Sequence, residues 1–143
     1  MIAFTKFIYK REQMTKTNFM DKYPIFSYEI LKSETTFKST DEIIKHLKGL
    51  VEQHPVAKFI ATFDHYEHTS SMEEGVIASE ILAAKNLIFC FGKQLPNTKI
   101  MAVRPRSIGV VELADSFVVD FLEVPNEQLQ IVQVGWIKDL KNN

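Results

Sequence analysis

The 143-residue chain has few of the residues and motifs that would assign it to a specialised class of protein. It contains one cysteine, five glycines, five prolines and one tryptophan. A single cysteine excludes an intramolecular disulfide, so nothing points to an oxidising compartment. The sequence has no glycine-rich phosphate loop, no nucleophile elbow and no dinucleotide fingerprint. No motif therefore indicates a particular reaction.

An excess of charge and a long hydrophobic run are also missing. Seventeen basic residues against eighteen acidic ones give a net charge of −1, so neither nucleic acid nor an anionic membrane is expected as a partner. No apolar segment approaches the roughly 18 residues of a membrane-spanning helix, and the first residues lack the pattern of a secretory leader. We therefore expect a cytoplasmic protein.

The composition that remains is that of an ordinary globular domain, with 45% hydrophobic and 24% charged residues. A chain of this length can bury a core without disulfides or metals. Basic residues without clear apolar periodicity fill residues 1–22, and this predicts a basic N-terminal tail. Residues 23–143 are expected to form a single domain.

The segment that organises the prediction is residues 56–64, a nearly continuous apolar run that ends in polar side chains. Its length and its strand-forming residues predict a central β-strand that is covered on both faces. A second apolar run, residues 87–91, ends at Gly92 and predicts another interior strand. Two such strands predict a sheet whose faces are covered by helices.

Periodicity, caps and turns predict the other elements. Period-two alternation from Phe26 predicts a strand, and a Ser-x-x-Glu capping box at residues 39–42 predicts a helix that ends before Pro55. A short helix should follow Pro96, a hairpin should turn at residues 114–116, and a last helix should begin at Pro125-Asn126. Together these predict an α+β domain with a mainly antiparallel sheet of about five strands and two main helices, in the order β-α-β-β-(short α)-β-β-α.

Several short motifs recur in this order along the chain. They are Asp64-His65 after an apolar strand, then Gly75, then Leu87-Ile88-Phe89 leading to Gly92, and an apolar hairpin ending in Val124-Pro125. Over about residues 26–140 this pattern resembles the small prokaryotic domain-of-unknown-function family numbered three hundred and two. The resemblance implies an α+β fold and a homodimer, and it implies no established activity.

Five consecutive polar or titratable residues begin at the last position of the 56–64 strand: Asp64, His65, Tyr66, Glu67 and His68. Three interpretations remain open for them. His65, or else Asp64, could be catalytic as an acid or base. His65, His68 and Glu67 could hold a metal ion if a helical turn brings them to one face. Alternatively, Asp64 caps the following turn and His65 satisfies buried backbone groups.

Two further positions have alternative interpretations. Arg104 and Arg106 flank a proline and could present two guanidinium groups to a carboxylate or phosphate, or they could form ion pairs with Glu73, Glu74 or Asp115.

The single cysteine, Cys90, could be a nucleophilic thiol if its strand lies beside that of Phe63, because His65 would then be near. A lone cysteine between Phe89 and Phe91 is also typical of an inert core residue.

These observations lead to three functional hypotheses. The first is a binding protein for a small anion at the end of the 56–64 strand, and the second is an enzyme with His65 as general base or metal ligand. The third is a homo-oligomeric structural protein whose edge at residues 117–122 pairs with its copy. No cofactor is indicated by any motif. The candidate ligand-binding residues are His65, Tyr66, His68, Arg104 and Arg106.

Overall fold

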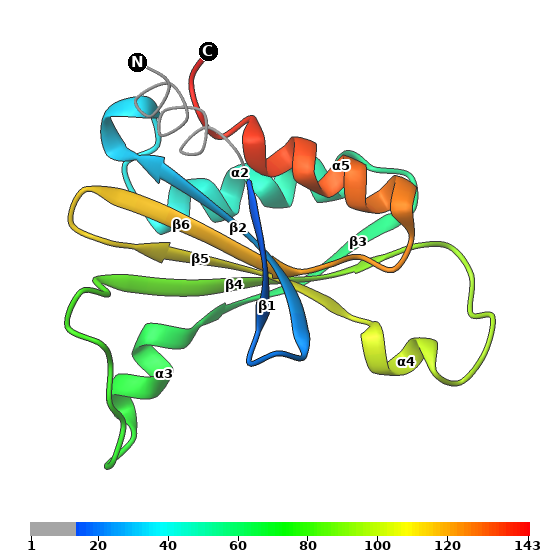
Figure 1. Cartoon of the computed structure of the whole chain (residues 1–143), viewed down its shortest axis with the longest axis horizontal. Coiled ribbons are helices and arrows are strands. Elements are labelled where there is room, and N and C mark those ends of the chain that lie inside the picture. The colour runs from blue at the N-terminus through cyan, green and yellow to red at the C-terminus, as the bar shows by residue number, and fades with distance from the viewer. Residues whose placement is uncertain (1–13) are drawn as a thin grey trace.

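The computed structural model describes residues 14–143, which form one six-stranded antiparallel sheet with helices (Figure 1). The strand order is β1-β2-β6-β5-β4-β3, so the last strand returns to lie beside the second. The α+β class and the antiparallel sheet are as predicted, with one more strand. The strands are β1 (Thr15–Phe19), β2 (Tyr23–Leu31), β3 (Ala57–Asp64), β4 (Ala83–Phe91), β5 (Arg106–Glu112) and β6 (Ser116–Leu122).

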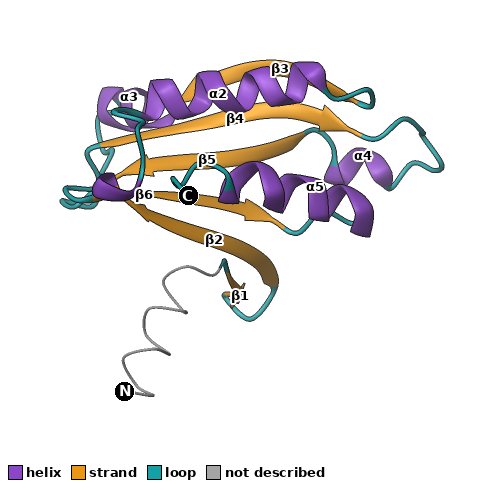
Figure 2. Cartoon of the chain, turned by 90° about the horizontal axis from the view of Figure 1, so that it is seen from above, coloured by secondary structure: helices purple, strands orange, loops and turns teal. Residues whose placement is uncertain are grey.

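Two long helices pack on one face of this sheet, and two short ones lie at its ends. Figures 1 and 2 show α2 and α5 side by side on the same face, whereas α3 and α4 lie at opposite ends of the strands. Among the helices of residues 14–143, none has the length and apolar character needed to cross a lipid bilayer. The helices are η1 (Lys32–Glu34, a 3-10 turn), α2 (Thr40–Gln53), α3 (His65–Ser71), α4 (Ile100–Val103) and α5 (Glu127–Lys138).

The start of α2 follows the predicted capping box. The hydroxyl oxygen of Ser39 accepts a hydrogen bond from the backbone N–H of Glu42 at 3.2 Å. The Glu42 carboxylate accepts one from the backbone N–H of Lys38, one residue before the cap. The helix ends at residue 53, because Pro55 cannot continue it. Both ends of α2 are therefore set by local sequence.

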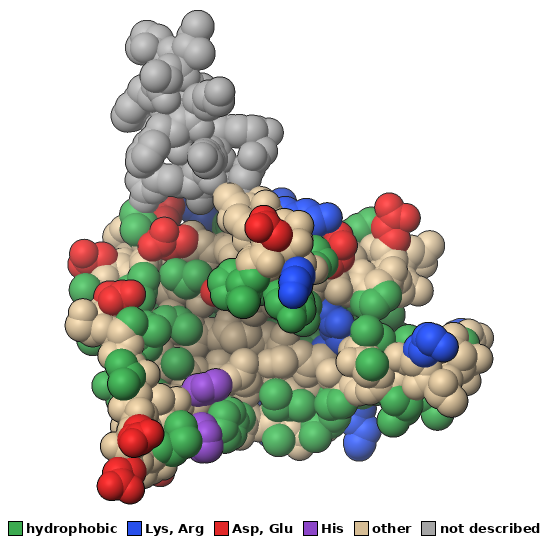
Figure 3. Space-filling model, turned by 60° about the horizontal axis from the view of Figure 1, so that its bottom comes forward, with side chains coloured by type: hydrophobic (Ala, Val, Ile, Leu, Met, Phe, Trp, Pro, Cys, Tyr) green, Lys and Arg blue, Asp and Glu red, His purple; other side chains and the backbone are tan. Residues whose placement is uncertain are grey.

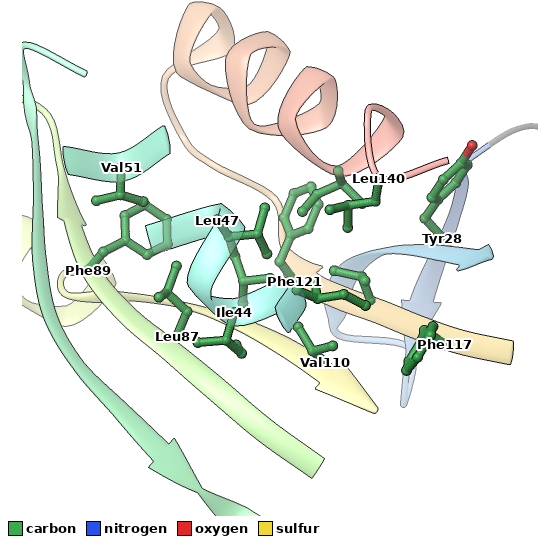
Figure 4. Close-up of a cluster of buried hydrophobic side chains, with 14 of the residues drawn as sticks. Tyr28, Ile44, Leu47, Val51, Leu87, Phe89, Val110, Phe117, Phe121 and Leu140 are labelled. Atoms are coloured by element: carbon green, nitrogen blue, oxygen red, sulfur yellow. The ribbon is translucent and has the colours of Figure 1, made fainter. Parts of the chain in front are cut away.

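The hydrophobic core lies between the sheet and the helix pair (Figure 4). Alternate side chains of β4 point into it, and Trp136 of α5 stacks on Phe91 at 5.2 Å between ring centroids. Burial of apolar side chains on this one face is the main force that holds the helices to the sheet. The labelled core residues are Tyr28, Ile44, Leu47, Val51, Leu87, Phe89, Val110, Phe117, Phe121 and Leu140.

The prediction of a central strand at residues 56–64, covered on both faces, is wrong. Strand β3 is the last strand of the sheet, and its outer side chains Ile60 and Phe63 are 50% and 41% exposed. A β-bulge between Phe59 and Ala61 interrupts its pairing with β4. Only one face of the sheet is covered by long helices. An apolar run has the same appearance in an edge strand that packs on a helix and in an interior strand.

The N-terminal part of the described chain also differs from expectation. Residues 15–19 of the expected basic tail form β1, which pairs with β2 from Thr15 opposite Ser27 to Phe19 opposite Tyr23. The first thirteen residues of that tail lie outside the described part of the chain. Strand β1 is the additional strand that the predicted five did not include. Polar residues on an edge strand carry little of the periodicity by which strands are recognised.

The hairpin of β5 and β6 is confirmed, but its expected free edge is not. Strand β6 is hydrogen-bonded to β2 on one side and to β5 on the other. Residues 117–122 therefore cannot pair with a second copy of the chain in the way the third hypothesis requires. The two edges of the sheet belong to β1 and β3.

Candidate functional site

The polar cluster after β3 begins with a helix cap. One carboxylate oxygen of Asp64 accepts a hydrogen bond from the backbone N–H of Glu67 at 2.9 Å, so Asp64 is the N-cap of α3. Its other oxygen lies 3.8 Å from the ammonium of Lys85. Lys85 also donates a hydrogen bond to Asp41 at the start of α2. This hydrogen bond is the largest reason why the pKa of Lys85 is raised. The interpretation of Asp64 as a structural cap is confirmed.

His65 and His68 lie on the exposed side of α3. Their ring centroids are 6.1 Å apart, and each ring contacts Phe63, at 5.4 Å and 5.3 Å respectively. Because the His65 side chain is exposed, it does not satisfy buried backbone groups, and that expectation is wrong. Within residues 14–143 no three His, Cys, Asp or Glu side chains are arranged to hold a metal ion. The general-base and metal interpretations of His65, His68 and Glu67 stay predictions.

A cavity of about 200 Å³ lies beside α3. His65 and Tyr66 line it together with apolar side chains of the segment before β4, among them Ile77 and Ile81. Arg104 and Arg106 are not part of this lining. Figures 1 and 2 show the reason, since α3 and α4 lie at opposite ends of the molecule. The predicted ligand-binding residues are thus divided between two places.

The two arginines line a larger cavity of about 450 Å³, here called the arginine cavity. Its walls come from the end of β4, the loop before α4, the start of β5 and the start of α5. Proline and asparagine at the start of α5 complete one wall. The lining residues are Val56, Phe91, Gly92, Lys93, Gln94, Pro96, Ile100, Val103, Arg104, Arg106, Val124, Pro125, Asn126 and Leu129.

Arg106 is the most buried charged residue of this cavity, with 7% of its surface exposed. Its Nη2 donates hydrogen bonds to the backbone carbonyls of Leu122 and Glu123, the second at 3.0 Å, and its Nη1 donates to that of Val103 at 3.4 Å. Its Nε is buried and has no hydrogen-bond partner among the described residues. Burial lowers the pKa of Arg106. The guanidinium is thus held by carbonyl dipoles alone.

Arg104 is held by the loop that precedes α4. Its Nη1 donates to the carbonyl of Gln94, and its guanidinium occupies the space where Gly92 would carry a Cβ atom. Gly92 has φ +115°, a conformation that favours glycine. In the described part of the chain neither Arg104 nor Arg106 forms an ion pair with a carboxylate. The alternative of ion pairs with Glu73, Glu74 or Asp115 is therefore wrong.

Cys90 lies away from the histidines. It pairs with Lys58 across β3 and β4, whereas Asp64 pairs with Lys85, five residues earlier on β4. Five residues of strand span about 17 Å. The expected juxtaposition of Cys90 and His65 is wrong because the two strands run antiparallel and place them near opposite ends.

Sequence reasoning missed two residues of the arginine cavity, Lys93 and Asn126. Both directly follow residues that had been recognised as the end of a strand or the start of a helix, Gly92 and Pro125. Both residues could have been identified as candidates from their positions at the end of a predicted strand and at the start of a predicted helix. Spacing along the chain does not show that these ends meet.

The comparison with protein families matches residues 14–142 to the Family of unknown function (DUF6858). The resemblance to the family numbered three hundred and two is therefore wrong. A strand that ends in glycine and a hairpin that ends in proline are general signals of strand ends and turns, so they do not identify one family. The comparison with curated proteins finds no match, and the comparison with solved structures finds none.

Proposed function

This chain belongs to the Family of unknown function (DUF6858), whose description assigns no activity, and we propose that the protein binds a small organic anion in the arginine cavity. The observation that carries the proposal is the buried guanidinium of Arg106, which no carboxylate among the described residues neutralises. A charge taken out of water is costly unless it is paired. An anion in the cavity would supply that pair.

The charge of the cavity lining supports the proposal. Lys93, Arg104 and Arg106 all line it, and its lining contains no aspartate or glutamate. Guanidinium groups bind carboxylate and phosphate through short, charge-assisted hydrogen bonds. Lys93 is exposed at the surface and Arg104 is half-buried, so positive charge extends from the solvent to the buried Arg106.

The apolar part of the lining indicates that the ligand also has a hydrophobic body. Side chains of Phe91, Ile100, Val103 and Leu129 share the cavity with the basic residues. A volume of about 450 Å³ lies within the usual range for small-molecule sites, which combine apolar walls with a few polar groups. A carboxylate with a short aliphatic or aromatic body has both properties.

The same lining favours binding over catalysis. No carboxylate, imidazole, thiol or hydroxyl side chain belongs to it. These are the groups that most often act as nucleophile or general base. An enzyme that uses His65 would need a different site, at α3. The arginine cavity is suited to hold an anion and to exclude water from it.

A thermal-shift experiment with hexanoate tests the proposal. A ligand of the native state at about 100 times its dissociation constant adds roughly 2.7 kcal/mol of stability. Hexanoate should therefore raise the melting temperature by several degrees, and hexanol at the same concentration should not. In Arg104→Gln most of the hexanoate shift should be lost, because the guanidinium that faces the cavity is gone. Arg106 is kept, since its bonds to Leu122 and Glu123 are structural.

A variant with the same change of charge elsewhere provides the control. Lys45 is exposed on α2 and does not line the arginine cavity, so Lys45→Gln should keep the full hexanoate shift. If hexanol stabilises the protein as much as hexanoate, or if Arg104→Gln responds like Lys45→Gln, the arginine cavity is not an anion site.

A further inference from the structure

We propose a second ligand site, for a small organic amine, on the face of the sheet that no long helix covers. This open face carries a cavity of about 410 Å³ between strands β4, β5 and β6 and helix α4, here called the open-face cavity. The two cavities share Val103 and Arg106, but Lys93 and Arg104 line only the arginine cavity and Asp120 lines only the open-face cavity. Variants at Arg104 and at Asp120 therefore test the two sites separately. Its lining residues on the sheet include Asn86, Ser107, Gly109 and Asp120.

A row of polar and small residues crosses the sheet at this place. Asn86 lies opposite Gly109, Gly109 lies opposite Asp120, and Asp120 lies opposite Ser27. Side chains alternate between the faces of a strand, and Ile108 and Val110 on either side of Gly109 are fully buried under the helices. The row therefore belongs to the open face. Figure 3 shows this face, with hydrophobic side chains around a central region of polar groups and backbone.

Asp120 is the charged group that the row presents. One of its carboxylate oxygens accepts a hydrogen bond from the hydroxyl of Ser27 on the next strand, which fixes the side chain. The carboxylate is half-buried, and no lysine or arginine of residues 14–143 forms an ion pair with it. A partly desolvated carboxylate favours a cationic partner. An ammonium group in the cavity would be such a partner.

The neighbouring groups suit an ammonium ion with a short hydrocarbon chain. The side-chain NH₂ of Asn86 donates to the hydroxyl of Ser107 at 2.9 Å, which leaves the amide oxygen of Asn86 as a second acceptor. Ile25, Leu122 and Val103 give the cavity apolar walls. Gly109 contributes no side chain, so its place in the row is the hollow between Asn86 and Asp120.

One basic residue, Arg106, also lines the open-face cavity. It lies opposite Phe89 in the register of β4 and β5, so its side chain leaves the strand on the helix-covered face. Its guanidinium is engaged with the backbone carbonyls of Leu122, Glu123 and Val103. The side chain of Asp120 projects from the other face of the sheet, the open face. The carboxylate therefore decides which ligands the open face accepts.

Titration of the full chain with n-butylamine, followed by backbone amide NMR, tests this inference. Butylammonium should shift the amide signals of β5, β6 and α4, whereas butanol should not. In Asp120→Asn the affinity should fall about tenfold or more, because a charge-assisted hydrogen bond is replaced by a neutral one. Asparagine keeps the size of the side chain and can still accept from Ser27.

Two further variants make the test specific. Glu29 lies on the open face outside the cavity and accepts a hydrogen bond from Ser116, as Asp120 does from Ser27, so Glu29→Gln should bind butylamine like the unchanged protein. A Cβ at Gly109 would lie 3.6 Å from its nearest neighbours, Asn86 and Asp120. Gly109→Ala should therefore fold normally and bind several times more weakly. Equal shifts with butanol, or unchanged affinity in both Asp120→Asn and Gly109→Ala, would overturn the proposal.

Discussion

At the scale of single residues, Gly92 shows how one position supports the arginine cavity in two ways. Its φ of +115° needs a residue without a side chain, and its missing Cβ leaves room for the guanidinium of Arg104. Both requirements come from the same change of direction at the end of β4. The glycine therefore links the end of the strand to the position of a proposed binding group.

We expect Gly92→Ala to lower the free energy of unfolding by about 1–3 kcal/mol, since a non-glycine residue is strained in that conformation and would displace Arg104. Gly135 in α5 is the matched control, because a Cβ there meets nothing within 4 Å. Gly135→Ala should instead stabilise the protein by up to about 1 kcal/mol. Urea unfolding of both variants measures these changes. An unchanged unfolding free energy in Gly92→Ala would show that this position does not require glycine.

Residues differ in how far their roles follow from sequence. The cap formed by Asp64 was one of the predicted alternatives, because a helix cap depends on the residue and on the next three positions. Asp120 was not recognised as a candidate, since its role depends on Ser27, which is 93 residues away. Arg104 and Arg106 were predicted to bind an anion, and that role stays a proposal.

At the scale of elements, Lys85 connects three parts of the fold. It lies on β4, donates a hydrogen bond to Asp41 at the start of α2, and lies 3.8 Å from Asp64, the cap of α3. The ammonium group complements the negative side chains at the N-terminal ends of both helices. Its side chain is largely covered, with 18% exposed. A single basic residue thus holds two helix starts against one strand.

This arrangement predicts a dependence of stability on alkaline pH. The hydrogen bond to Asp41 is the largest effect on the pKa of Lys85, and the nearby carboxylate charges add to it. Together they outweigh the opposing effect of burial and raise the pKa above its ordinary value of 10.5. The stabilisation is fully present below the unfolded pKa and is lost as pH rises through the folded one. The difference in unfolding free energy between the unchanged protein and Lys85→Met should therefore shrink above about pH 10.5. Chemical denaturation at a series of pH values measures it.

The exposed Lys45 supplies the control for this prediction. Lys45 forms no ion pair with a carboxylate within residues 14–143, so its replacement removes one lysine without removing such a contact. Lys45→Met should differ from the unchanged protein by an amount that hardly varies with pH. A Lys85→Met difference that stays equally constant would show that the contact with Asp41 does not stabilise the folded state.

The elements that sequence predicted well are those with local signals at both ends. Helix α2 has Ser39 at its start and Pro55 just after its end, and the β5–β6 hairpin has a short polar turn. Strand β3 lacked such a signal for its place in the sheet. Its apolar residues pack on α2 on one side, whereas Ile60 and Phe63 are exposed on the other. Whether a strand is central or at an edge depends on distant strands.

At the scale of the whole molecule, the fold is one sheet with a helical layer on one side. The face from which a strand side chain projects therefore decides whether that side chain packs in the core or lies on the open face. Leu87 and Ile88 are neighbours on β4, but Leu87 is fully buried under α2 while Ile88 points to the open face. The resemblance that implied a homodimer is wrong, so the homodimer stays a prediction, and the 117–122 segment cannot be its partner surface because β6 is paired on both sides.

Adjacent substitutions on β4 test this one-sided architecture. Leu87→Ala should lower the unfolding free energy by about 2–5 kcal/mol, as is usual when a buried leucine is truncated. Ile88→Ala should cost roughly half that or less, because it removes less area from a packed environment. Urea unfolding curves of the two variants provide the comparison. Equal losses would mean that the open face is covered in solution.

Along β5 and β6, side chains alternate between the helix-covered face and the open face, and the two faces place different requirements on the residue type. Ile108, Val110 and Val119 are tied to the packing beneath the helices, whereas Ser107 and Asp120, one position away, meet no helical layer. Exchanges at every second position can therefore alter the chemistry of the uncovered side with little disturbance to folding. Such a scaffold is free to diversify in what it recognises while its interior stays unchanged.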